Sequence, residues 1–114
     1  MNASQILIAA RVRALAQIAT LTEDVEEMIA ASASSNADDE HDPEGATIAF
    51  ERAQLSALLA AARRRLDDIE QALEHVRNGR YGRCLACGEP VGAERLAARP
   101  ATRTCISCAR PSRR

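Results

Sequence analysis

Two cysteine pairs near the end of the chain constrain its fold more than any other feature. Each pair has the form C-x-x-C, and seventeen residues separate the first pair from the second. Two intervening residues let a tight turn direct both sulfurs at one ion, and this separation is typical of zinc sites. The sequence therefore predicts one structural zinc ion held by all the cysteines of the chain: Cys84, Cys87, Cys105 and Cys108.

Disulfides and redox chemistry explain these cysteines less well. No export signal precedes them, and the βαβ pattern that accompanies a redox C-x-x-C is missing from the sequence. Four thiolates also leave zinc no open coordination position for catalysis. The sequence contains no nucleophile triad and no phosphate-binding glycine loop either, so we do not expect an enzyme.

Apolar side chains recur every three or four residues in two stretches upstream of the cysteines, which predicts two long helices. The first spans residues 4–33, and its expected buried stripe is Ile8, Val12, Leu15, Ile18, Leu21, Val25 and Met28. The second begins at Asp42-Pro43 and ends at Asn78-Gly79, which are typical start and stop signals. Its heptad seam is Ile48, Arg52, Leu55, Leu59, Ala62, Leu66, Ile69, Leu73 and Val76.

The segment between the two helices is short and polar, which favours an antiparallel hairpin within one chain over a dimer. We therefore expect a mainly α fold, an antiparallel helical hairpin (coiled coil) with a small C-terminal C4 zinc finger. The predicted domains are residues 1–79, with an acidic tip at about 34–46, and residues 80–114, a zinc-finger module with a short basic tail. A short helix over residues 93–98, ended by Pro100, is expected inside that module.

Charge is distributed unevenly although the net charge is only −1. Residues 21–50 contain nine acidic side chains and no lysine or arginine, whereas residues 77–114 contain nine arginines and only Glu89 and Glu94. No uncharged run approaches the 18 residues of a membrane span, so we expect a cytoplasmic protein.

Three motifs together resemble the DksA/TraR C4-type zinc-finger family. They are Tyr81-Gly82-Arg83-Cys84-Leu85-Ala86-Cys87-Gly88, Arg95-Leu96-Ala97-Ala98-Arg99-Pro100 and Cys105-Ile106-Ser107-Cys108-Ala109. The acidic Asp-Pro turn between two coiled-coil arms is similar to that family as well. The resemblance implies a transcription regulator that binds RNA polymerase directly and inserts its coiled coil into the secondary channel to modulate promoter complexes.

The resemblance also implies which residues act. The family tip carries an acid-x-Ala element after Asp-Pro, which falls here on Asp42, Glu44 and Ala46. The best-known members have aspartate where Glu44 stands and one more residue between the proline and the alanine. Some members help to form a site for the alarmone ppGpp with basic residues on the second arm and near the finger, and Arg63, Arg64 and Arg65 are nearby in sequence. The basic residues expected to contact a partner are Arg63, Arg64, Arg65, Arg95 and Arg99.

A nucleic-acid-binding zinc-ribbon protein that dimerises through its coiled coil is the alternative function. Clustered arginines bind phosphates, but base stacking needs aromatic side chains and only Tyr81 is available near them. Direct sequence-specific DNA binding is therefore not expected, and we expect a monomer.

Overall fold

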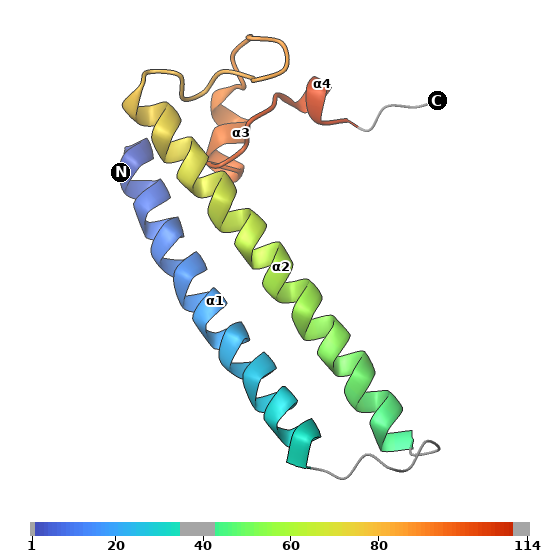
Figure 1. Cartoon of the computed structure of the whole chain (residues 1–114). Helices are drawn as coiled ribbons and strands as arrows, with labels where there is room; N and C mark the ends of the chain where they lie inside the picture. Colours follow the sequence, from blue (N-terminus) through green and yellow to red (C-terminus); the bar gives the residue numbers. More distant parts are fainter. Residues whose placement is uncertain (1, 35–42, 111–114) are drawn as a thin grey trace. The chain divides into compact units, whose positions relative to one another are not determined.

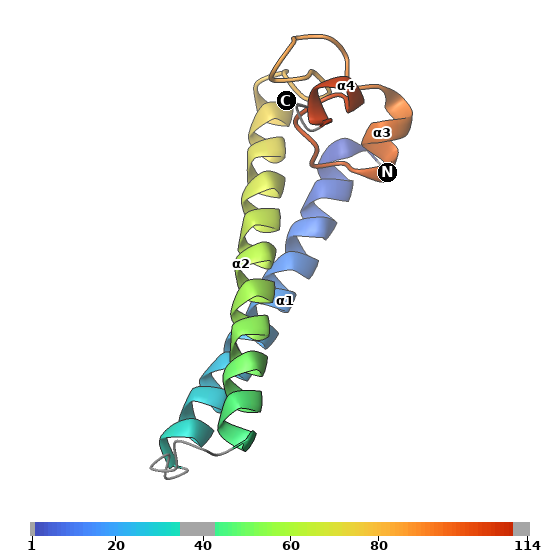
Figure 2. The ribbon, with the colours of Figure 1, turned by 90° about the vertical axis from the view of Figure 1, so that its right-hand side faces the viewer.

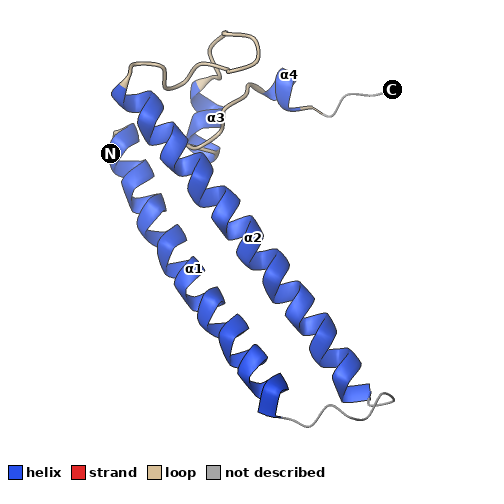
Figure 3. Ribbon diagram, viewed as in Figure 1, coloured by secondary structure: helices blue, strands red, loops and turns tan. Residues whose placement is uncertain are grey.

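In the computed structural model, residues 2–34 and 43–110 are described, and helices account for most of them. The helices are α1 (Ala3–Ser34), α2 (Pro43–Arg77), α3 (Ala93–Ala98) and α4 (Ile106–Ala109) (Figures 1 and 3). Within the described ranges there is no strand, only an isolated bridge between Arg83 and Pro90. This confirms the predicted fold class, a helical hairpin followed by a small C-terminal module.

The ends of α2 follow from local sequence signals. The helix begins at Pro43, whose fixed φ suits the first helical position, while the expected cap Asp42 lies outside the described residues. At the other end Gly79 has a φ of +76°, which favours glycine. The Arg80 N–H donates to the His75 carbonyl at 2.8 Å and the Gly79 N–H to the Val76 carbonyl at 3.4 Å. These two bonds form a Schellman motif, so the predicted stop at Asn78-Gly79 is confirmed.

Contacts within the chain divide it into two compact units. We call Met1–Arg13 with Arg65–Arg114 the zinc unit, and Ala14–Arg64 the hairpin unit. Both long helices contribute to both units. The predicted division into residues 1–79 and 80–114 separates the helical hairpin from the cysteine-containing segment and does not use these contacts. It stays a prediction.

The zinc unit has a small core with contributions from the helices and from the C-terminal module. Its buried apolar residues are Leu7, Ile69, Ala72, Cys84 and Val91. Leu7 is fully buried, and its helix runs beside the last turns of α2 (Figure 2). The Arg11 guanidinium pairs with the Glu70 carboxylate at 3.3 Å across these two helices. The first turns of α1 are therefore fixed to the end of α2 mainly by packing, with one exposed ion pair across the contact.

The hairpin unit is packed around alanine. Its buried apolar residues are Ala14 and Ala62, and the larger residues of the seam, such as Ile18, Leu55 and Leu59, are only partly covered. Small side chains allow close approach of two helices but bury little area per residue. The predicted α2 seam is confirmed, because its apolar members are all buried or partly buried and only Arg52 is exposed.

The predicted stripe of α1 is wrong in its first half. Ile8, Val12 and Leu15 are 53%, 62% and 42% exposed, whereas Leu7 and Ala14 are buried. From Ile18 onward the stripe is partly buried as expected. In the first half of α1, the packed positions lie one residue earlier than predicted, which corresponds to a rotation of about 100° about the helix axis. In the described part of the chain, no helix combines the length and apolar character needed to cross a membrane.

Candidate metal centre

The two cysteine pairs lie on two different kinds of turn. In the first, the Gly88 N–H donates to the Cys84 carbonyl at 2.8 Å, and Gly88 has a φ of +78°. In the second, Cys105 directly precedes α4 and the Ala109 N–H donates to the Cys105 carbonyl at 2.9 Å. Each turn thus directs its sulfurs to one side, the first through a left-handed glycine and the second through one turn of helix.

The four sulfurs converge on one point. The Sγ atoms of Cys84, Cys87, Cys105 and Cys108 all lie within 4.8 Å of one another. The Cys87 and Cys105 sulfurs are 3.8 Å apart, and none of the cysteines forms a disulfide. Four thiolates at about 2.3 Å from a tetrahedral zinc ion are separated by about 3.8 Å, so the donor set fits zinc. A closed set of four thiolates makes the ion structural, as predicted.

Hydrogen bonds around the sulfurs separate their acidities. The backbone hydrogen bond from Cys105 is the main cause that lowers the pKa of Cys84 to about 6. The side-chain hydrogen bond with Cys105 is the main cause that raises the pKa of Cys108 to about 12. Without a metal ion, Cys84 therefore ionises at a lower pH than Cys108. A divalent cation would favour the fully deprotonated set, so zinc binding would release protons.

Polar contacts fix the rest of the module around the cysteines. The Tyr81 hydroxyl donates to the Pro100 carbonyl at 2.8 Å, and burial raises the pKa of this phenol. The Arg95 guanidinium donates to the Thr104 carbonyl at 2.9 Å and to the Thr102 hydroxyl at 3.2 Å. Arg95 is predicted to contact a partner, and in this structure its guanidinium donates hydrogen bonds within the module.

Three of the five predicted basic residues line one cavity of the zinc unit. This cavity has a volume of about 870 Å³, and Arg65, Arg95 and Arg99 are among the residues that line it. Arg63 and Arg64 are exposed and belong to the hairpin unit, so they are not part of this wall. The cavity is rich in arginine and suits an anion better than a cation.

The predicted tip is only partly described. Asp42 lies outside the described residues, and so does the side chain of Glu44, although its backbone is in the first turn of α2. Ala46, the fourth residue of α2, is exposed. The role of these three residues stays a prediction.

Arg103 was missed by reasoning from the sequence. Its guanidinium donates to the Gln71 amide oxygen at 2.6 Å and to the Asp68 carboxylate at 2.8 Å. Nothing in the sequence distinguishes it from the other arginines of this basic segment, because its partners lie more than thirty residues away.

Comparisons with known proteins agree with this arrangement. Residues 79–114 match the family described as the prokaryotic dksA/traR C4-type zinc finger. The structure of transcription factor DksA2 from Pseudomonas aeruginosa is similar to this chain, with a TM-score of 0.75 and 26% sequence identity over 93% of this chain and 76% of that one. The predicted resemblance to the DksA/TraR family is therefore confirmed.

Curated relatives match over shorter segments. The RNA polymerase-binding transcription factor DksA of Caulobacter vibrioides is 50% identical over 38 residues, 33% of this chain and 27% of that protein. An uncharacterized protein of Aquifex aeolicus is 48% identical over 44 residues, 39% of this chain and 30% of that protein. The protein YteA of Bacillus subtilis is 39% identical over 66 residues, 58% of this chain and 28% of that protein. The matched segments thus span less than a third of each of these relatives.

Proposed function

We propose that this chain is a cytoplasmic transcription regulator that binds RNA polymerase directly, rather than an enzyme. The observation that carries the proposal is the likeness to DksA2, which extends over 93% of the chain and so includes the helical hairpin as well as the cysteine module. The segment similar to the RNA polymerase-binding DksA of Caulobacter vibrioides adds the name of a partner, RNA polymerase.

In the proposed mechanism the hairpin enters the secondary channel of the polymerase. The tip of the hairpin would deliver Asp42 and Glu44 near the catalytic centre, where carboxylates would perturb the field of the catalytic Mg²⁺, the largest local charge. Ala46, two residues further along α2, would give the tip a small surface for close approach. The zinc ion has no part in chemistry here and would only stabilise the module.

The first test is direct binding. Core RNA polymerase should retain the purified protein in a pull-down without DNA, and light scattering should give the mass of a monomer. A dimer that binds DNA and leaves the polymerase unbound would favour the alternative, a zinc-ribbon protein that dimerises through its coiled coil.

The second test concerns the tip. Replacing Asp42 and Glu44 with alanine should abolish the effect on transcription while polymerase affinity and zinc content stay near those of the wild type. The matched control is Glu23→Ala with Glu26→Ala, which removes the same charge from exposed positions of α1. Glu44→Asp should retain activity if charge matters, and full activity of the double alanine variant would remove the tip from the mechanism.

We also propose that the arginine-lined cavity of the zinc unit takes part in binding ppGpp. Arg13 and Arg99 contribute to its wall beside Arg65, and the alarmone carries several phosphate charges. A transcription assay with and without ppGpp, repeated with Arg99→Ala, tests this. An equal response to the nucleotide in both proteins would exclude Arg99 from the site.

A further inference from the structure

Arg103 contacts both α2 and the metal-binding module. Its two terminal nitrogens donate to two different acceptors on α2, Asp68 at 2.8 Å and Gln71 at 2.6 Å. These acceptors are three residues apart on the helix, so they share a face. Gln71 donates its own amide N–H to Asp67 at 2.9 Å, which leaves its oxygen directed at Arg103. The planar fork of one arginine thus spans almost a full turn of helix.

The backbone of Arg103 connects the two cysteine pairs. Its carbonyl accepts the Leu85 N–H at 2.8 Å, and Leu85 lies between the two cysteines of the first pair. Arg103 is itself two residues before Cys105, the first cysteine of the second pair. One residue is therefore joined to α2 by its side chain and to both halves of the metal site by its main chain.

The segment around Arg103 is held on both sides. Arg95 donates to the Thr102 hydroxyl and to the Thr104 carbonyl, and the Thr102 hydroxyl also donates to the Thr104 carbonyl at 3.2 Å. Because its neighbours are fixed to the module, a movement of Arg103 would also move the module. The side chains of Arg103 and Asp68 are only 39% and 40% exposed, so water screens their contact only in part.

We propose that Arg103 is a positioning residue that couples zinc binding to the packing of the module on α2. The four cysteines would hold zinc between the two pairs, and a bound ion would stabilise the Leu85–Arg103 main-chain hydrogen bond that joins them. This presents the Arg103 fork to Asp68 and Gln71. Because coupling between two equilibria is reciprocal, the contact with α2 in turn strengthens zinc binding.

The test measures zinc affinity by competition with a chromophoric chelator, using the full chain. Arg103→Glu and Asp68→Arg should each weaken zinc binding about fivefold, as expected for the loss of a partly exposed ion pair. The double variant, which exchanges the two charges, should recover most of that loss. Arg80→Glu is the control, because it makes the same charge change at an exposed position of the same module.

Amide hydrogen exchange supplies a second readout. In zinc-loaded protein, Arg103→Glu should speed amide hydrogen exchange at Leu85 and in α2 around Asp68. The double variant with the two charges swapped should slow amide hydrogen exchange again at the same positions. Asp68→Asn, which keeps shape and loses charge, serves if either reversed variant fails to fold, and it should weaken zinc binding in the same direction. Wild-type zinc affinity in both Arg103→Glu and Asp68→Asn, or no recovery in the double variant, would overturn the proposal.

Discussion

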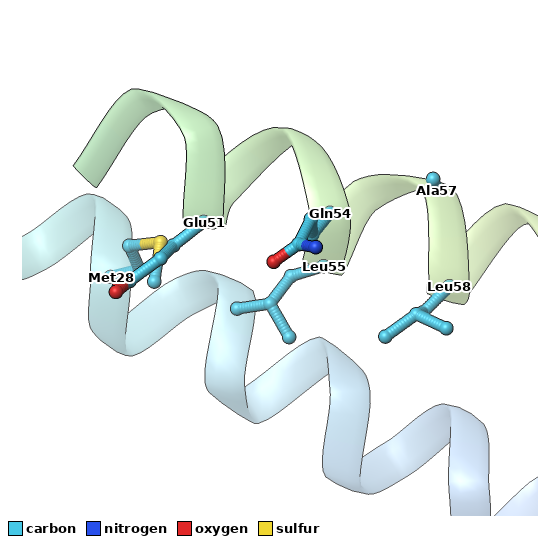
Figure 4. Close-up of a pocket in the computed structure, with 6 residues that line it drawn as sticks. All are labelled: Met28, Glu51, Gln54, Leu55, Ala57 and Leu58. Atoms are coloured by element: carbon cyan, nitrogen blue, oxygen red, sulfur yellow. The ribbon is translucent and has the colours of Figure 1, made fainter. Parts of the chain in front are cut away.

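The zinc unit and the hairpin unit contain parts of the same two helices but are stabilised in different ways. The zinc unit buries Leu7 and Ile69, contains four converging cysteines and has polar contacts between its segments. The hairpin unit buries only alanines among its described residues and leaves Leu15, Ile29, Phe50 and Leu58 exposed. A cavity of about 590 Å³ also opens between its helices, beside Met28, Leu55 and Leu58 (Figure 4).

This difference indicates where the stability of the chain resides. Metal binding, buried leucine and isoleucine and side-chain hydrogen bonds reinforce one another in the zinc unit. The hairpin unit depends instead on the high helix propensity of its alanines and on a partly covered seam. Local opening should therefore be easier in the hairpin unit, as is common for segments that adapt to a partner.

Removing zinc should have the largest effect and should be confined to one unit. Apparent binding energies of structural zinc are about 10–16 kcal/mol, so chelation or Cys84→Ser should unfold the C-terminal module. Most of the helical circular dichroism should remain, because α1 and α2 contain 32 and 35 residues. Backbone NMR spectra with and without chelator would show which residues unfold. Complete loss of helix on chelation would contradict the expectation that zinc stabilises only the zinc unit.

Truncating a leucine should cost more in the zinc unit than in the hairpin unit. Leu7→Ala empties a fully buried position and should lower the free energy of unfolding by about 2–5 kcal/mol. Leu15→Ala, on the same helix but exposed, should lower it by less than about 1 kcal/mol. Urea unfolding of both variants measures the difference, and equal losses would show that the burial difference does not govern stability.

Enlarging a seam alanine tests how closely the helices approach in the hairpin unit. Ala62 is fully buried, so Ala62→Leu should destabilise the protein by about 1–3 kcal/mol through overpacking. The control Ala53→Leu is on an exposed position of the same helix and should change stability by less than about 0.5 kcal/mol. A stabilised Ala62→Leu variant would mean that the two helices can separate at little cost.

The ion pair between Arg11 and Glu70 should have the smallest effect. Both side chains are nearly half exposed, so their coupling should be below about 1 kcal/mol and should weaken as salt is added. A double-mutant cycle with Arg11→Ala and Glu70→Ala at two salt concentrations measures it. A coupling energy that does not change with salt would mean that this ion pair contributes to the stability of the zinc unit more than its exposure suggests.

Sequence reasoning was accurate where one pattern had one interpretation. The cysteine spacing, the α2 seam and the helix over Ala93–Ala98 were all predicted correctly, because each rests on local geometry. The stripe of α1 was misplaced because two adjacent faces both carry apolar residues at helical spacing. The larger aliphatic residues favoured the face of Ile8 and Val12, yet the helices pack through Leu7 and Ala14.

Polar contacts between residues far apart in the sequence could not be predicted from the spacing of apolar residues. Arg103 and Asp68 are 35 positions apart, and a charged pair of this kind leaves no repeating pattern. Arg95 is predicted as a basic contact for a partner, and that role stays a prediction, but the sequence did not indicate that Thr102 and Thr104 accept its hydrogen bonds within the module. Only the folded chain separates arginines that hold the module together from those left for a ligand.

Tyr81, whose hydroxyl donates to the Pro100 carbonyl, makes the zinc unit observable by ultraviolet light alone. The chain contains one tyrosine and no tryptophan, and the tyrosine is within the metal-binding module. Its fluorescence therefore originates almost entirely from that module, without any label. Emission recorded during heating would follow the melting of one region, while circular dichroism at the same temperatures follows the helices.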